Sequence, residues 1–178
     1  MKRLLICLLL VSVVGCEQPA PAPIAPNKAI SESNKAEAEF NKGIDFADRE
    51  DWTTAIACFD KAIQLAPYYA NAYYHRGRAY IHLEEYDKAI ADCTEAIRIK
   101  PDVANTYGSR GVAYARLGQS DKAIADYTEA IRIDPDVAYT YYNRGLAYHE
   151  LGQYDKAIAD YTEAIRIDPD FANAYHDR

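Results

Sequence analysis

The sequence predicts an all-α fold, a solenoid built from tandem helix–turn–helix repeats. The chain is self-similar with a period of 34 residues from Ala36 onward, and small and aromatic residues recur at helical spacing within each period. Proline closes every period, at Pro67, Pro101, Pro135 and Pro169. Because one repeat of this kind cannot bury its apolar face alone, several repeats must stack to form a continuous core.

The composition limits the classes of protein to which the chain can belong. Its 178 residues are 49% hydrophobic and 26% charged, which suits one ordinary globular domain. Acidic residues outnumber basic ones by 27 to 20, for a formal net charge of −7. This sign argues against a nucleic-acid partner, because such proteins need a basic face that displaces counterions.

Residues 1–15 have the organisation of a signal peptide, with Lys2 and Arg3 before an apolar run from Leu4 to Val14. A transmembrane helix is the weaker interpretation, since roughly 20 apolar residues are needed to cross a bilayer. The ending Val-Val-Gly-Cys at Cys16 resembles a bacterial lipobox. This resemblance implies a lipoprotein signal peptide over 1–15, acylation of Cys16 and an address in the bacterial cell envelope.

An ordinary cleaved signal is the alternative to lipidation. Its only small-x-small site, Ala20-Pro21-Ala22, is interrupted by proline and lies far from the apolar run. We therefore expect a lipid anchor on Cys16, in the outer membrane and facing the periplasm. Several acyl chains on one cysteine hold a protein on a membrane more firmly than a single chain does.

Residues 16–32 form a Pro/Ala-rich segment that starts at the anchored cysteine. Its prolines alternate with alanines and no apolar period is present. Residues 17–30 in a polyproline II helix would make a semi-rigid tether of up to roughly 40 Å, at about 3.1 Å per residue. A flexible tail without a spacer role is the alternative interpretation of the same residues.

The four repeats are expected at 36–69, 70–103, 104–137 and 138–171. Counted from the start of each repeat, glycine occupies position 8, alanine occupies positions 20 and 27, and mostly aromatic residues occupy positions 11 and 24. Small residues let two antiparallel helices approach closely, and the aromatic rings fill the space beside them. The second helices of repeats 2 to 4 are predicted at Tyr86–Ile99, Ser120–Ile133 and Tyr154–Ile167.

This pattern resembles the signature of the tetratricopeptide repeat family over residues 36–171. The resemblance implies a right-handed α-solenoid and a non-enzymatic scaffold that holds a peptide or a partner helix in its concave groove. Residues 172–178 match the start of a truncated fifth repeat. Solenoids normally end in a polar capping helix, so we expect either a fragment or an end that associates with a partner or a second copy.

Candidate groove residues come from the differences between repeats 3 and 4, which fall mostly at positions that this family directs into the groove. Drift after a recent duplication is the alternative explanation. The Lys and Asn residues of the family's two-carboxylate clamp are not carried over, since Gly108 and Val112 stand at two of the positions. The predicted partner-binding residues are Asn71, Tyr74, Arg78, His82, Asn105, Arg116, Tyr139, Tyr142, Leu146, His149 and Glu150.

Arginine at position 7 and aspartate at position 23 change together along the repeats. Repeats 2 to 4 have Arg76, Arg110 and Arg144 with Asp92, Asp126 and Asp160, whereas repeat 1 has Lys42 and Cys58. We expect an ion pair between the two helices of each of these repeats, with repeat 1 as an atypical cap.

The chain lacks the residue patterns that enzymes use. Its histidines have no metal-ligand spacing, no glycine-rich phosphate loop is present, and no serine or cysteine nucleophile has a plausible base. We therefore expect no catalytic residue, metal or cofactor. Cys58 and Cys93 are expected to be buried as small apolar groups, with a disulfide as the alternative.

The function favoured by the sequence is a lipid-anchored adaptor for an unidentified protein or peptide partner. Two alternatives stay open. The chain can be the N-terminal recognition arm of a longer enzyme truncated at Arg178, or a self-assembling spacer. The first predicts further coding sequence downstream, and the second predicts self-association through the C-terminal end.

Overall fold

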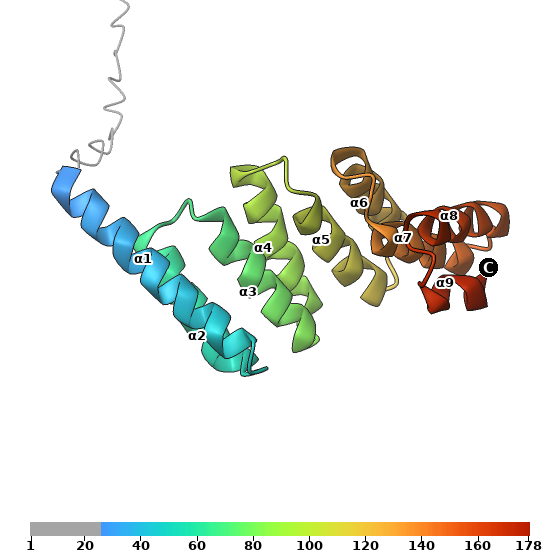
Figure 1. Cartoon of the computed structure of the whole chain (residues 1–178). Coiled ribbons are helices and arrows are strands. Elements are labelled where there is room, and N and C mark those ends of the chain that lie inside the picture. The colour runs from blue at the N-terminus through green and yellow to red at the C-terminus, as the bar shows by residue number, and fades with distance from the viewer. Residues whose placement is uncertain (1–25) are drawn as a thin grey trace, which may run out of the picture.

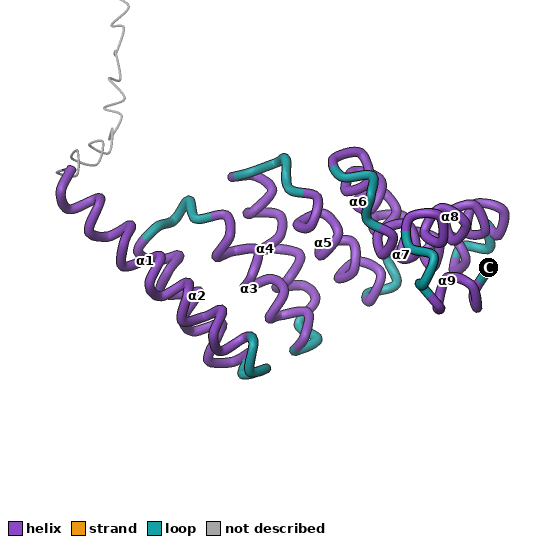
Figure 2. The backbone as a smooth tube through the Cα atoms, in the orientation of Figure 1, coloured by secondary structure: helices purple, strands orange, loops and turns teal. Residues whose placement is uncertain are grey.

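The computed structural model describes the backbone of residues 26–178 and the side chains from residue 31. Within this part of the chain every residue lies in a helix or in a short loop, and no strand is present (Figure 2). The helices are α1 (Pro26–Ala47), α2 (Trp52–Leu65), α3 (Ala70–His82), α4 (Tyr86–Ile99), α5 (Ala104–Arg116), α6 (Ser120–Ile133), α7 (Ala138–Glu150), α8 (Tyr154–Ile167) and α9 (Ala172–Asp177).

The helices stack in chain order, so that α1 and α9 lie at opposite ends of an elongated array (Figure 1). The most extensive contacts join α1 to α2, α3 to α4, α5 to α6 and α7 to α8, and each pair also packs on the next pair. These are the helix–turn–helix repeats of the predicted solenoid. The fold class is confirmed, and α4, α6 and α8 begin and end at the residues that the sequence predicts.

The N-terminal helix begins earlier than the sequence predicts. The expected tether covered 16–32, but residues 26–32 are helical and continue into the first repeat. Proline is well tolerated in the first helical turn, where its missing N–H has no acceptor in any case, and the following residues include good helix formers. The tether prediction for 16–25, the signal peptide and Cys16 lie outside the described residues.

Close contact between a glycine and an aromatic ring holds the two helices of a repeat together. A Cβ added to Gly111 would lie 2.7 Å from Cε1 of Tyr127, and one added to Gly145 would lie 2.5 Å from Cε1 of Tyr161. Real Cβ atoms do not approach this closely, so the backbone of the first helix rests directly on the ring. Tyr127 also belongs to a buried cluster with Ala123 and Ala147, which joins repeat 3 to repeat 4.

Both cysteines of the described region are free and buried, as expected, and they form no disulfide. Burial raises the pKa of Cys93 to about 12 and also raises the pKa of Cys58. Both thiols are therefore protonated and unreactive at neutral pH.

Among the described helices, none is both long enough and apolar enough to cross a membrane. The side chains from residue 31 onward also contain no group of three or more His, Cys, Asp or Glu residues that could hold a metal ion.

Candidate binding groove

Two adjoining hollows, of about 650 Å³ and about 230 Å³, lie over repeats 2 to 4. We call them together the central hollow. Its walls come mainly from the first helices of these repeats, α3, α5 and α7. The two parts share the residues Val112, Arg116, Tyr127, Tyr139 and Asn143.

Most of the predicted groove residues line this hollow. The larger part is lined by Tyr74, Arg78, His82, Asn105, Arg116 and Tyr139, and the smaller part by Leu146 and Glu150 in addition to Arg116 and Tyr139. The sequence therefore identifies residues of three different helices that the fold brings to one surface. Asn71, Tyr142 and His149 line neither part.

Tyr142 is excluded from the hollow because α9 covers it. Its hydroxyl donates a 2.8 Å hydrogen bond to Oδ2 of Asp177, and its ring centroid lies 5.0 Å from that of Phe171. Burial, the hydrogen bond to Asp177 and the charge of that carboxylate raise the pKa of Tyr142 to about 12. His149 packs instead against the ring of Tyr154 in its own repeat, with the centroids 5.2 Å apart.

Side chains at position 5 of one repeat and position 6 of the next are in contact near both ends of the array. The rings of Phe40 and His75 are 5.3 Å apart between repeats 1 and 2, and Tyr142 of repeat 4 bonds Asp177 of the following segment. None of these four residues lines the central hollow.

The junction between repeats 3 and 4 is open because position 5 is Gly108. A Cβ added to Gly108 would meet no atom within 4 Å, so the missing side chain leaves space in the larger part of the hollow. Asn143, at position 6 of the next repeat, lies at the opposite side of this junction. The hollow therefore lies in the middle of the array, over repeats 2 to 4.

Sequence reasoning missed several lining residues. Ser109 and Asn143 stand at position 6, which differs between repeats 3 and 4 but was not counted as a groove position. That difference was a usable signal. Tyr127 was assigned to the core, and it is only 2% exposed, yet it lines both parts of the hollow. Burial raises the pKa of its hydroxyl, which is therefore neutral at physiological pH.

Two predicted groove residues are oriented by aromatic neighbours. The guanidinium of Arg78 lies 5.9 Å from the ring centroid of Tyr74, in a cation–π contact. The ring of His82 is stacked on Trp52 of repeat 1, with 3.9 Å between centroids and 2° between planes. These contacts place both side chains without using the N–H donors of Arg78.

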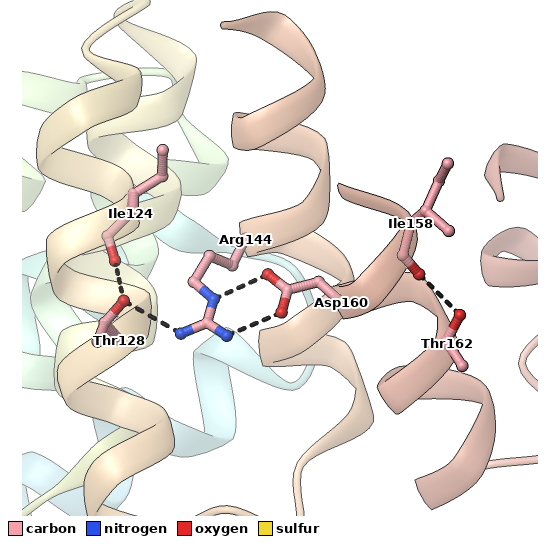
Figure 3. A network of polar contacts seen from close by, with 6 residues as sticks. All are labelled: Ile124, Thr128, Arg144, Ile158, Asp160 and Thr162. Carbon is pink, nitrogen blue, oxygen red and sulfur yellow. Dashed lines mark hydrogen bonds and ion pairs between the residues drawn. The ribbon is translucent and has the colours of Figure 1, made fainter. Parts of the chain in front are cut away.

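The predicted ion pair at positions 7 and 23 is present in repeats 2 to 4. In repeat 4, Nε and Nη2 of Arg144 each donate a 2.8 Å hydrogen bond to a different carboxylate oxygen of Asp160 (Figure 3). The hydrogen bonds and the charge of Asp160 raise the pKa of Arg144 despite its burial. Such paired donation fixes the guanidinium plane as well as the charge.

The structure adds a bond between neighbouring repeats that the sequence did not predict. Nη1 of Arg144 donates a 3.1 Å hydrogen bond to Oγ1 of Thr128 in repeat 3, and this hydroxyl donates to the carbonyl of Ile124 (Figure 3). Arg110 bonds Thr94 in the same way. Each arginine therefore joins three helices, which holds α3, α5 and α7 in register around the hollow.

In repeat 2 the acceptor from the preceding repeat is a carboxylate. Arg76 bonds both oxygens of Asp92, and its Nη1 donates a 2.5 Å hydrogen bond to Asp60 in repeat 1. Repeat 1 itself has no such pair, since Lys42 bonds Glu39 on its own helix. Repeat 1 thus supplies an acceptor to the network although its own position 7 is Lys42 and not an arginine.

Comparisons with known proteins agree with this architecture. Residues 70–103 and 138–171 match a family model described as tetratricopeptide repeat, and 43–83 and 114–152 match a second one described as TPR repeat. Together these matches cover more than half of the chain. A search of curated proteins finds no significant match.

Solved structures include a crystal structure of MamA, similar to this chain with 28% identity and a TM-score of 0.73 over 83% of this chain and 86% of that one. MamA from Desulfovibrio magneticus RS-1 has 24% identity and a TM-score of 0.72, over 80% and 81%. The first TPR of Spaghetti bound to the HSP90 peptide SRMEEVD has 26% identity and a TM-score of 0.61, over 71% and 95%. The chain belongs to the tetratricopeptide repeat family.

Proposed function

We propose that this protein is a non-enzymatic adaptor that binds a peptide or a partner helix in the central hollow while a lipid on Cys16 holds it at the cell-envelope membrane. The observation that carries the binding role is the hollow itself, whose larger part has a volume of about 650 Å³. Ligand sites in proteins commonly measure about 300–1,000 Å³.

The chemistry of the lining supports a protein or peptide ligand. Tyr74, Tyr139 and Arg116 line the hollow, and Tyr139 is 58% exposed. Tyrosine and arginine contribute large contact areas and directional hydrogen bonds, and they are enriched where binding energy concentrates in protein interfaces. The similar domain of Spaghetti was solved with a bound peptide.

The anchor rests on the sequence alone. The lipobox-like ending at Cys16 follows a cationic and apolar leader and precedes a Pro/Ala-rich segment. We propose the outer membrane, on its periplasmic face, as the site of anchoring. The proposed binding role does not depend on this cellular location.

Site-specific photocrosslinking in cells that make the full chain tests the binding role. A photoreactive residue at Asn105, which is exposed and lines the hollow, is expected to capture a partner. The same residue at Arg132, which is exposed on α6 outside the hollow, is the matched control.

The variant Gly108→Tyr supplies the steric test. Tyrosine stands at this position in repeats 2 and 4, and a Cβ at Gly108 meets nothing, so the variant is expected to fold while its ring fills the hollow. Loss of the Asn105 adduct in this variant, with unchanged helicity by circular dichroism, supports the proposal. Adducts that form equally from Arg132, or that survive Gly108→Tyr, contradict it. An adduct of two copies of the chain would indicate self-assembly instead.

A further inference from the structure

We infer that the segment bound in the central hollow carries acidic side chains, and that Arg78 and Arg116 contact their carboxylates. This inference rests on the proposed function and names the chemistry of its partner. It follows from the charges that the fold leaves without partners, from the size of the hollow and from the position of Gly108.

The first observation is a difference between two groups of arginines in repeats 2 to 4. Six of them have a carboxylate partner in the structure, namely Arg76, Arg98, Arg110, Arg132, Arg144 and Arg166. Among the side chains that the structure describes, no carboxylate lies within 4.0 Å of Arg78 or Arg116. In a chain with 27 acidic and 20 basic residues, carboxylates are in excess, so a general shortage of partners does not explain the difference.

The second observation is that these two arginines line the same hollow from different helices. Arg78 extends from α3 and Arg116 from the last turn of α5, and both are exposed. The cation–π contact with Tyr74 holds the guanidinium of Arg78 but leaves its N–H donors free. A guanidinium with free donors at a fixed place matches a carboxylate in both charge and geometry.

Acidic residues of the chain itself do not fill this role. Glu84 lines the larger part of the hollow without reaching either arginine. Glu150 lines the smaller part, where its Oε2 accepts a 2.8 Å hydrogen bond from the hydroxyl of Ser120. In the lining of the larger part Glu84 is the single carboxylate, whereas Arg78 and Arg116 supply two positive charges.

The size of the hollow implies a short anchoring segment. Its larger part, of about 650 Å³, lies between α3, α5 and α7 and includes the space left by Gly108. A few side chains fit this volume, so a short peptide with two nearby acidic residues is the occupant that the size of the hollow and its two arginines favour.

The test uses the full chain and an array of nonapeptides with blocked ends. The peptides have random flanks and are made in matched pairs, with Glu-Glu at the centre of one member and Gln-Gln at the centre of the other. We expect the Glu-Glu member to bind roughly tenfold or more tightly within the responsive pairs, since charge-assisted hydrogen bonds are about twice as strong as neutral ones. Raising the salt from about 50 mM to about 300 mM should weaken this preference.

Arginine variants assign the preference to the hollow. Arg78→Gln and Arg116→Gln are each expected to reduce Glu-Glu binding by roughly tenfold. Arg132→Gln removes an exposed arginine outside the hollow and should leave binding unchanged. Thermal unfolding of each variant separates loss of binding from loss of fold.

The possible outcomes distinguish the two proposals. Equal binding of Glu-Glu and Gln-Gln members that Gly108→Tyr abolishes would overturn the acidic partner while supporting a peptide groove. A free C-terminal carboxylate that restores binding to Gln-Gln members would overturn recognition of acidic side chains. A Glu-Glu preference that Arg132→Gln lowers as much as Arg116→Gln does would indicate general attraction between charges and overturn the inference.

Discussion

Glu50 has a backbone conformation that glycine adopts in the corresponding turns of repeats 3 and 4. Its φ is 61°, and the equivalent Gly118 and Gly152 have φ values of 69° and 70°. A residue with a Cβ is strained there, because the side chain crowds the following carbonyl. Glu84, at the same place in repeat 2, has a φ of 60°.

We predict that Glu50→Gly raises the free energy of unfolding by about 0.5–1 kcal/mol, since relief of the strain exceeds the extra entropy of glycine in the unfolded chain. Chemical denaturation followed by circular dichroism measures the change. Gly118→Ala is the converse control and should lower stability, although its Cβ meets no atom within 4 Å. If Gly118→Ala instead raised stability, the positive φ would not be the cause of strain at this turn position.

His75 of repeat 2 makes the stability of the fold depend on pH. Its ring lies among Phe40, Phe59 and Tyr74, and burial, aided by the charge of Arg78 and opposed by that of Asp48, lowers its pKa to about 4. Above pH 6.5 the imidazole is neutral in both the folded and unfolded states. Between pH 6.5 and about 4 the unfolded chain binds a proton that the folded chain does not, so folding becomes less favourable.

We predict that stability falls as the pH drops from 6.5 towards 4, with a contribution from His75 of at most about 1.4 kcal/mol per pH unit, reduced by partial solvent exposure. His75→Phe retains an aromatic ring and should remove this part of the slope. Urea denaturation at several pH values measures it. Identical slopes for the two proteins would assign the acid sensitivity to other groups.

At the scale of the helices, the arginine network connects elements that pack in different repeats. Arg110 bonds both carboxylate oxygens of Asp126 on α6 at 2.8 Å and the hydroxyl of Thr94 on α4 at 3.1 Å. The side chains of Arg110 and Asp126 are 17% and 8% exposed, so water replaces these bonds poorly. Removing one partner therefore leaves a buried charge unpaired.

We predict that Arg110→Ala lowers the free energy of unfolding by about 3–5 kcal/mol, in line with loss of one member of a buried pair. The effect should be clearly smaller in an Asp126→Asn background, because the charge that Arg110 satisfies is then already absent. A double-mutant cycle measured by denaturation gives the coupling energy. Equal effects of Arg110→Ala in both backgrounds would show that the pair contributes no coupling.

At the scale of the whole molecule, the proposed anchor of the array is Cys16, which lies outside the described residues. We predict that Cys16→Ser abolishes incorporation of a labelled fatty acid and moves the protein from the membrane fraction to the soluble fraction. Gln18→Ala, two residues further on, is the control and should change neither. Retention of Cys16→Ser on the membrane would contradict lipid anchoring and support retention by the uncleaved leader.

Much of the fold was predictable because the same residue types recur at the same positions in successive repeats. Proline at the end of each period and glycine in the turns mark helix ends, and both act through local backbone geometry. The pair formed by Arg144 and Asp160 was predictable because the two residue types change together between repeats. The early start of α1 was missed because Pro26 was assigned to a polyproline II tether, whereas proline is also favourable in the first turn of a helix.

The candidate site was predictable in position but not in extent. Positions that vary between similar repeats indicated residues that do line the hollow, such as Arg116 and Tyr139. The same reasoning included Tyr142, which Asp177 and Phe171 of the following segment cover. Whether a groove position is open depends on the residue that faces it from the next repeat, and periodicity within one repeat contains no such information.

The sequence by itself determined the helical repeats, the bounds of the second helices of repeats 2 to 4, and the ion pair within each of these repeats, because all three depend on spacing along the chain. Only the tertiary structure decided how neighbouring repeats meet. It placed Thr128 as an acceptor for Arg144, left an opening at Gly108, and covered Tyr142 with Asp177 and Phe171. These features arise from contacts between residues of different repeats, where packing rather than local preference selects the arrangement.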